Sequence, residues 1–247
     1  TNIFPIDSEH FSLHYFFKYQ NISNYNIRKI YLTASGGPFL GKKFHSLNKI
    51  KFSQAIKHPK WNMGYKNSID SATMVNKCLE IIEAHYLFNI SFDKIDILVH
   101  PQSIVHSVIE QRNYISSMIL FKNDMKIPIK NFFFEDTKNF INYDSKFYYD
   151  FKSELHFSKI KISEFPVYNY FMKLDKERPI NIINFNIANE IAVDLFKNNK
   201  ILYTDIYKFI RNTNSLNLNY NIKNIKGIIE YHEKFEKKLY EEYNSYI

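Results

Sequence analysis

The sequence predicts an α+β protein, in which a mixed α/β domain at residues 1–130 is followed by a small all-α helical-bundle domain at residues 166–247. Strand-like and helical stretches alternate up to about residue 130. Apolar residues then recur at spacings of three and four from Pro166 onward, which is typical of helices. Residues 131–165 show no clear periodicity and are rich in Asn, Asp, Lys and aromatic residues, so we expect a connecting segment there.

Three strands and one helix are predicted in the first domain. Residues 27–33 favour a strand that ends in a glycine turn at residues 35–38. Residues 95–100 and 116–121 favour two more strands. A helix capped by Asp70 or Ser71 is predicted next to them, with Glu80 and Glu83 on its polar side. Its apolar face would consist of Met74, Val75, Cys78, Leu79, Ile82 and Tyr86.

The second domain is predicted to contain helices at residues 184–198 and 225–243. Ile187, Ile191 and Leu195 share one face of the first helix. The second helix carries an apolar face of the same kind, formed by Ile228, His232, Phe235 and Leu239.

Composition narrows the function classes. The net charge of the 247 residues is +8, but the lysines are scattered, so a basic nucleic-acid-binding protein is an alternative that rests on charge alone. The single cysteine excludes an intrachain disulfide and favours a reducing compartment. No run approaches the roughly 20 apolar residues of a membrane span, and no signal peptide is visible.

Three carboxylates form a candidate metal site. Asp7 and Glu9 are two residues apart, so on a strand-like segment they would point to one side. Glu80 lies on the predicted helix. Acidic pairs at strand ends and helical glutamates are usually solvated, but three carboxylates buried together would repel one another and need a cation. Oxygen ligands suit Mg²⁺ or Mn²⁺. Asn76 and Lys77, about one turn before Glu80, could hold an anionic substrate beside the metal.

Two segments are candidates for phosphate binding. Ser35 precedes Gly36 and Gly37, and glycines let backbone N–H groups approach a phosphate closely. Ser71 near a helix N-terminus could do the same, with Lys77 supplying the matching charge. The alternatives are a flexible turn and an ordinary helix cap.

The segment HPKWNMG at residues 58–64 contains the only Trp of the chain, bracketed by Pro59 and Gly64. It is predicted to be a loop that could close over a substrate, whereas a lone Trp is otherwise most often a core residue. The two histidines at residues 100–107 could form a catalytic or metal cluster, but such histidines are more often structural, and we prefer that interpretation for His100. Cys78 is predicted to be a small buried apolar residue.

Taken in order, these segments resemble the 1-deoxy-D-xylulose 5-phosphate reductoisomerase family. The matching runs are PIDSEH (5–10), TASGGPF (33–39), HPKWNMG (58–64), DSATMVNK (70–77) with Glu80 and Glu83, and HPQSIVHS (100–107). NEIA at residues 189–192 also resembles the family. The resemblance is specific over residues 4–107 and weaker over residues 131–183.

The resemblance implies that residues 1–130 form a catalytic, metal- and substrate-binding domain. Asp7, Glu9 and Glu80 would bind Mg²⁺ or Mn²⁺, which would act as a Lewis acid during the skeletal rearrangement. The substrate-binding residues would be Ser8, Ser35, His58, Trp61, Met63, Ser71, Asn76, Lys77 and Glu80. The catalytic residues would be Glu9, Glu83, His58 and His106.

The implied reaction ends with reduction by NADPH to 2-C-methyl-D-erythritol 4-phosphate, in the non-mevalonate route to isoprenoids. Met63 and Gly64 would contact NADPH, but the glycine-rich NADPH domain of the family does not precede Thr1. We therefore expect upstream sequence to be missing. A homodimer acting on a small sugar phosphate, without nucleic-acid or membrane partners, is implied as well. The implied location is the bacterial cytoplasm, with a plastid-type organelle as the alternative. The alternative is a degenerate relative that binds metal and sugar phosphate without redox activity.

Overall fold

The computed structural model describes residues 3–20, 22–58, 63–134, 154–213, 216, 218, 222 and 224–245. These residues form two compact units, each assembled from separate parts of the chain. The first unit contains the described residues of 1–37 and 77–160, and the second contains those of 38–58, 63–76 and 161–247. The predicted division into domains at residues 130 and 165 stays a prediction, because the compact units follow spatial neighbours rather than chain order.

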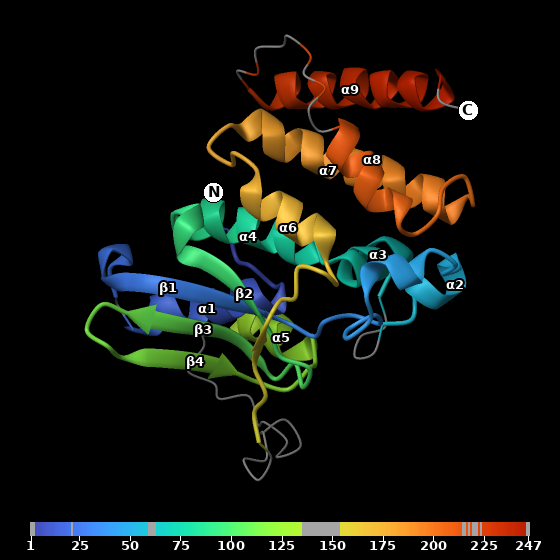
Figure 1. Cartoon of the computed structure of the whole chain (residues 1–247). Coiled ribbons are helices and arrows are strands. Elements are labelled where there is room, and N and C mark those ends of the chain that lie inside the picture. Colours follow the sequence, from blue (N-terminus) through green and yellow to red (C-terminus); the bar gives the residue numbers. More distant parts are fainter. Residues whose placement is uncertain are drawn as a thin grey trace. The chain divides into compact units, whose positions relative to one another are not determined.

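A mixed five-stranded sheet is the centre of the first unit (Figure 1). Its strand order is β4-β3-β1-β2-β5. The central strand β1 runs parallel to β2, with Ile30 opposite Ile95, and antiparallel to β3. The bounds are Ile27–Ala34 for β1, Ile95–Val99 for β2, Val105–Gln111 for β3, Ser116–Leu120 for β4 and Ser158–Lys159 for β5.

The three predicted strands are confirmed as β1, β2 and β4, and the predicted α+β class is confirmed. Strand β3 was not predicted. It begins at Val105, inside the segment at residues 100–107 that was interpreted through its two histidines. The apolar side chains of Val105 and Ile109, which are fully buried, are the signal for a strand there. The consecutive buried residues Leu32, Thr33 and Ala34 place buried side chains of β1 on both faces of the sheet, as expected for a central strand. In β2 the buried residues Ile95, Ile97 and Val99 alternate and share one face.

Three helices belong wholly or mostly to the first unit. Helix α1 (Ser8–Gln20) packs against β3 and β4. Helix α4 (Val75–Phe88) begins in the second unit and continues in the first from Lys77. Helix α5 (Lys126–Phe134) follows the sheet and carries exposed phenylalanines at its end. Short 3₁₀ turns at Asn24–Asn26 and Phe92–Lys94 precede β1 and β2.

Helices dominate the second unit, and α7 (Pro179–Lys197) packs against α8 (Asp205–Thr213) and α9 (Ile225–Ser245). The predicted helices at 184–198 and 225–243 are thus confirmed. Helix α6 (Pro166–Lys173) begins with proline at its first position, where the missing N–H costs nothing. The other elements of the unit are the 3₁₀ turn Phe44–Leu47, α2 (Phe52–Ala55) and α3 (Tyr65–Thr73).

The helix predicted to begin at Asp70 or Ser71 is wrong in its start. Both residues lie in the last turn of α3, and α4 begins separately at Val75. Met74 between them has φ 69°, in the left-handed region, and its N–H donates to the Ser71 carbonyl at 3.3 Å. The apolar spacing continues through this break, since Met74 and Val75 are both buried, so periodicity could not reveal it.

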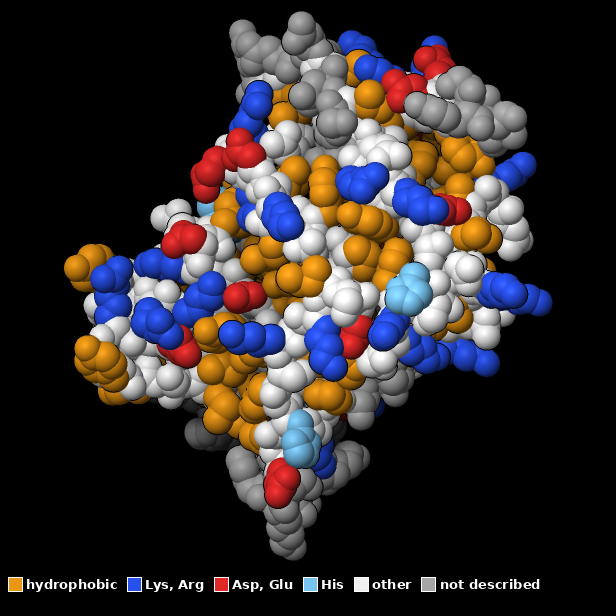
Figure 2. Space-filling model, viewed as in Figure 1, with side chains coloured by type: hydrophobic (Ala, Val, Ile, Leu, Met, Phe, Trp, Pro, Cys, Tyr) orange, Lys and Arg blue, Asp and Glu red, His pale blue; other side chains and the backbone are white. Residues whose placement is uncertain are grey.

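The surface carries its basic residues in a dispersed pattern. On the face shown in Figure 2, Lys and Arg side chains are interspersed with acidic and apolar ones. The basic side chains on this face are therefore not concentrated in one stripe.

The packing of α7 yields a stability prediction. Phe185 is fully buried, and its ring centroid lies 5.2 Å from that of Phe171 on α6. We expect Phe185→Ala to lower the free energy of unfolding by about 3–5 kcal/mol, measured by urea denaturation. Phe133→Ala is the control, since Phe133 is 68% exposed. Equal losses in the two variants would contradict the assignment of Phe185 to the core.

Candidate metal centre

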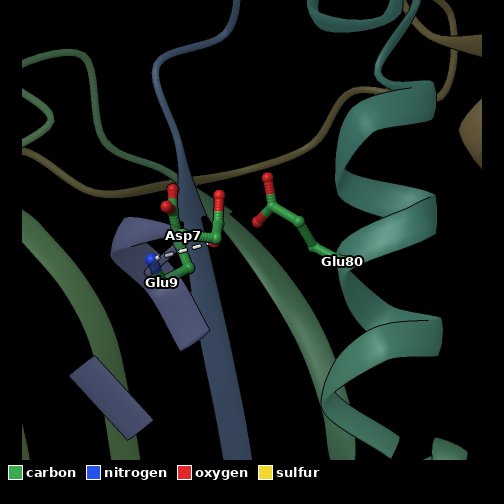
Figure 3. A group of neighbouring side chains, drawn as sticks. All are labelled: Asp7, Glu9 and Glu80. Carbon is green, nitrogen blue, oxygen red and sulfur yellow. Dashed lines mark hydrogen bonds between the residues drawn. The ribbon is translucent and has the colours of Figure 1, made fainter. Parts of the chain in front are cut away.

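The N-terminus of α1 places two of the three candidate carboxylates. The Asp7 carboxylate accepts hydrogen bonds from the backbone N–H groups of Glu9 (3.2 Å) and His10 (3.4 Å), and so caps the helix (Figure 3). The expected strand-like segment is therefore wrong: Ser8 and Glu9 form the first helical turn. The cap itself brings the Asp7 and Glu9 carboxylates together.

Glu80 reaches the same place from α4 (Figure 3). One carboxylate oxygen from each of Asp7, Glu9 and Glu80 lies within 4.8 Å of the others. Glu80 and Glu9 are 4% and 9% exposed, whereas the Asp7 side chain is 44% exposed and opens the group to solvent. Three oxygen donors that converge at an accessible point fit a hard divalent cation such as Mg²⁺ or Mn²⁺.

Lys77 compensates the negative charge in this structure. Its ammonium group donates to both oxygens of Glu80, at 2.8 and 2.7 Å, and to Oε1 of Glu9. Ser8 donates its hydroxyl to the other Glu9 oxygen. These oxygens are the ones that a divalent cation would use, so its binding requires Lys77 to give up at least part of these bonds. The side chain then becomes available to another anion.

Burial and mutual repulsion raise the pKa of two carboxyls in the group. For Asp7 the causes are burial and then the charge of Glu9. For Glu80 burial leads again, and repulsion from Glu9 and Asp7 adds to it against the attraction of Lys77. Burial also acts on Glu9, but Lys77 and His106 outweigh it and lower the pKa of Glu9 to about 2. The pKa of Lys77 is raised, since its carboxylate partners outweigh its burial.

His10 also belongs to this cluster, although no role was predicted for it from the motif PIDSEH. The ring is 1% exposed, with Nδ1 at 3.3 Å from Asp7 Oδ1 and 3.2 Å from Glu83 Oε2. Its Nε2 lies 3.0 Å from the Glu80 carbonyl oxygen. His10 therefore links the start of α1 to α4. The spacing of three from Asp7 would have indicated this, had residues 7–10 been predicted as a helix.

Two further histidines lie buried on the first unit. His106 on β3 is 2% exposed, its Nε2 lies 3.1 Å from the Phe121 carbonyl oxygen, and burial lowers its pKa. The negative charge of Glu9 acts on the pKa of His106 in the opposite direction, so His106 interacts electrostatically with the carboxylate group. His100 is fully buried, with Nδ1 at 2.8 Å from the His156 carbonyl oxygen and its ring stacked on Phe157. This geometry agrees with a structural role for His100.

The remaining predicted site residues are divided between the units. Ser35 follows β1 in the first unit, where its hydroxyl accepts a hydrogen bond from the Gly37 N–H at 3.2 Å. Gly36 and Gly37 have φ values of 90° and 66°, which explains the need for glycine there. The second unit contains His58, Met63, Gly64, Ser71 and Asn76. Trp61 lies outside the described residues. Cys78 is fully buried, as predicted.

Two family models match the chain. A model described as the 1-deoxy-D-xylulose 5-phosphate reductoisomerase C-terminal domain matches residues 3–88, and one described as the DXP reductoisomerase C-terminal domain matches residues 120–238. Among the part of the chain that the structure describes, no helix combines the length and apolar character needed to cross a bilayer.

Curated relatives carry the same family name. A 1-deoxy-D-xylulose 5-phosphate reductoisomerase of Clostridium beijerinckii is 44% identical over 210 residues, covering 85% of this chain and 54% of the relative. The protein of that name from Malacoplasma penetrans is 40% identical over 248 residues, covering 98% of this chain and 62% of the relative.

Solved structures of the family have the same fold. The Zymomonas mobilis enzyme in complex with NADPH matches with a TM-score of 0.84 and 31% identity, over 98% of this chain and 62% of that one. A DOX-P reductoisomerase in complex with NADPH, fosmidomycin and magnesium matches with a TM-score of 0.81 and 30% identity, over 98% and 64%. This chain thus spans between 54% and 64% of the length of these four proteins.

The fold defines an α+β protein with a mixed sheet in one unit and mainly helices in the other, in which the start of α1 and helix α4 bring three carboxylates together. The chain belongs to the 1-deoxy-D-xylulose 5-phosphate reductoisomerase family.

The carboxylate geometry predicts which acidic residue is indispensable for a metal. We expect Glu80→Gln to weaken Mn²⁺ binding roughly 100-fold or more, because removal of a direct ligand should exceed the 10–100-fold loss typical of outer partners. Titration followed by the electron paramagnetic resonance of free Mn²⁺ measures this. Glu110→Gln is the control, since Glu110 pairs with Arg28 on the sheet. Unchanged affinity in Glu80→Gln would exclude this metal centre.

The raised pKa values of Asp7 and Glu80 predict a pH dependence of metal affinity. Below these pKa values the two carboxyls carry protons that a cation must displace, so Mn²⁺ affinity should fall as the pH drops. The fall should begin above the ordinary carboxyl values of 3.8 and 4.5. Glu9, with its pKa of about 2, contributes no change in this range. Mn²⁺ titrations from pH 8 down to the acid limit of the folded protein test this, and an affinity that falls only below the ordinary carboxyl values would contradict it.

Proposed function

We propose that this chain is the metal- and substrate-binding portion of a 1-deoxy-D-xylulose 5-phosphate reductoisomerase. The full reaction would rearrange the carbon skeleton of the sugar phosphate and reduce the product with NADPH to 2-C-methyl-D-erythritol 4-phosphate. The convergence of Asp7, Glu9 and Glu80 around Lys77 is the observation that carries this proposal. The relatives' names and the magnesium and NADPH complexes of the solved neighbours support it.

The carboxylate group would orient the reacting end of the substrate. A Mg²⁺ or Mn²⁺ ion held by Asp7, Glu9 and Glu80 would supply Lewis-acid polarisation of substrate oxygens. Ser8, which is 7% exposed and hydrogen-bonded to Glu9, would contact the substrate close to these carboxylates. Glu83 would act through His10, since its carboxylate lies 3.2 Å from His10 Nδ1.

Anion recognition would fall to Lys77 with the serine and asparagine residues of the family motifs. Lys77 would exchange its carboxylate partners for the substrate phosphate or hydroxyls once a divalent cation neutralises Glu9 and Glu80. Ser35, Ser71 and Asn76 would supply hydrogen bonds to the same substrate. His58, Trp61 and Met63 would form a closing flap, and Met63 with Gly64 would contact NADPH. His106 would serve as a further catalytic group beside Glu9.

The family resemblance also supports a proposal on assembly and location. We propose a homodimer that acts on a small-molecule substrate in the bacterial cytoplasm. NADPH would be held mainly by a polypeptide segment that corresponds to the part of the relatives not matched by this chain.

Binding of the sugar phosphate to the Mn²⁺-saturated chain tests the proposal. Calorimetric titration should give saturable binding that Glu80→Gln abolishes. Lys77→Met should weaken it roughly 10–100-fold, the expected loss of a charge-assisted hydrogen bond. Lys29→Met is the matched control, because Lys29 pairs with Asp96 on the sheet and should leave binding unchanged.

Phosphate recognition is isolated by a second ligand. Titration with 1-deoxy-D-xylulose, which lacks the phosphate, should give much weaker binding, and Lys77→Met should then make little further difference. Absence of sugar phosphate binding by the folded, Mn²⁺-saturated chain would refute the proposed substrate site.

A further inference from the structure

The NEIA motif at residues 189–192 lies on α7, and the proposed function leaves it without a role. Asn189 is fully buried, and its Nδ2 donates to Oδ1 of Asp70 at 3.0 Å. Asp70 belongs to the DSATMVNK motif and is itself 2% exposed. Two motifs that are 119 residues apart therefore meet through one buried hydrogen bond inside the second unit.

A second buried hydrogen bond reaches the same turn of α3. The Tyr203 hydroxyl donates to the Ala72 carbonyl at 2.8 Å, and Tyr203 is 1% exposed. Its burial raises the pKa of the phenol, so the hydroxyl keeps its proton as a donor. The other Asp70 oxygen accepts from Lys66 one turn earlier in α3. The bonds from Asn189 and Tyr203 are the anchors discussed below.

The two anchors hold the residues on either side of Ser71. Asp70 and Ala72 are buried, whereas Ser71 between them is partly exposed. The chain leaves the helix two residues later, at Met74, whose left-handed conformation is one that a non-glycine residue adopts only when its surroundings enforce it. The end of α3 next to such a corner would lose part of its support if the buried carboxylate of Asp70 lost the bond from Asn189 and kept only Lys66 as a donor.

We propose that Asn189 and Tyr203 are positioning residues for substrate binding. They fix the last turn of α3 so that the Ser71 hydroxyl is presented to the sugar phosphate. This inference rests on the proposed function, in which Ser71 binds the substrate. The proposal predicts that the affinity for substrate, but not the affinity for metal, depends on the hydrogen bonds from Asn189 and Tyr203 to α3.

The chain offers a matched control on the same helix. Asn184 on α7 is also fully buried, and it also makes side-chain hydrogen bonds: it donates to the Leu216 carbonyl at 3.3 Å and accepts from the Tyr231 hydroxyl at 2.7 Å. Tyr231 belongs to α9, and these bonds do not reach α3. Asn184→Ala therefore removes a buried asparagine from α7 without releasing Asp70.

Titration of the Mn²⁺-saturated chain with 1-deoxy-D-xylulose 5-phosphate tests the proposal, with Mn²⁺ affinity measured separately. Asn189→Ala and Tyr203→Phe should each weaken sugar phosphate binding roughly tenfold or more, since small displacements of a binding group have effects of this size. Both should retain the wild-type Mn²⁺ affinity, because Asp7, Glu9 and Glu80 belong to the other unit. Asn184→Ala should leave both affinities unchanged.

The outcomes separate this proposal from the one on which it rests. If the wild type binds the sugar phosphate but Asn189→Ala and Tyr203→Phe behave like Asn184→Ala, the positioning role is refuted and the proposed function stands. If the wild type does not bind the sugar phosphate, both fail. Should Asn189→Ala not fold, Tyr203→Phe, which removes a single hydroxyl, decides the matter alone.

Discussion

Compensation of buried negative charge is the constraint on which the rest of the structure depends. Asp7, Glu9 and Glu80 converge within 4.8 Å, and two of them are almost completely buried. Such a group is stable only with a cation among its oxygens, a requirement that Lys77 meets in this structure. The capped start of α1 positions Asp7 and Glu9, and α4 positions Glu80. His10 links the two helices, because its ring contacts Asp7, Glu83 and the Glu80 carbonyl oxygen.

The break at Met74 connects this constraint to the helical unit. Ser71 lies before the break in α3, and Lys77 and Glu80 follow it in α4, so residues proposed for substrate and metal are adjacent in sequence but belong to different compact units. Within the second unit, Asn189 and Tyr203 form hydrogen bonds to the last turn of α3, just before the break. The proposed positioning role would give the helical unit a part in substrate binding in addition to its part in stability, and it would account for the contact between two motifs that are far apart in the sequence.

Sequence patterns predicted the parts of the structure that depend on local periodicity. The strands around Ile30, Ile97 and Met118 and the long helices α7 and α9 were found because their apolar spacing is regular. Strand β3 was missed because residues 100–107 were interpreted through their two histidines, of which β3 contains only His106. Helix α1 was not predicted, and the alternation of Asp7 and Glu9 at its start also fits a strand. The carboxylate set itself was predicted. The pairs Lys77–Glu9, His10–Glu83 and Asp70–Asn189 depend on tertiary contacts that no local pattern encodes.

The most direct test of this account is the anomalous diffraction of Mn²⁺ in crystals of the chain. The account predicts one strong anomalous peak in contact with oxygens of Asp7, Glu9 and Glu80, and a Lys77 side chain that has moved away from at least one of the two glutamates. An anomalous peak at another place would contradict the metal centre. A peak at the predicted place with Lys77 still bonded to both glutamates would contradict the exchange of Lys77 between carboxylates and substrate.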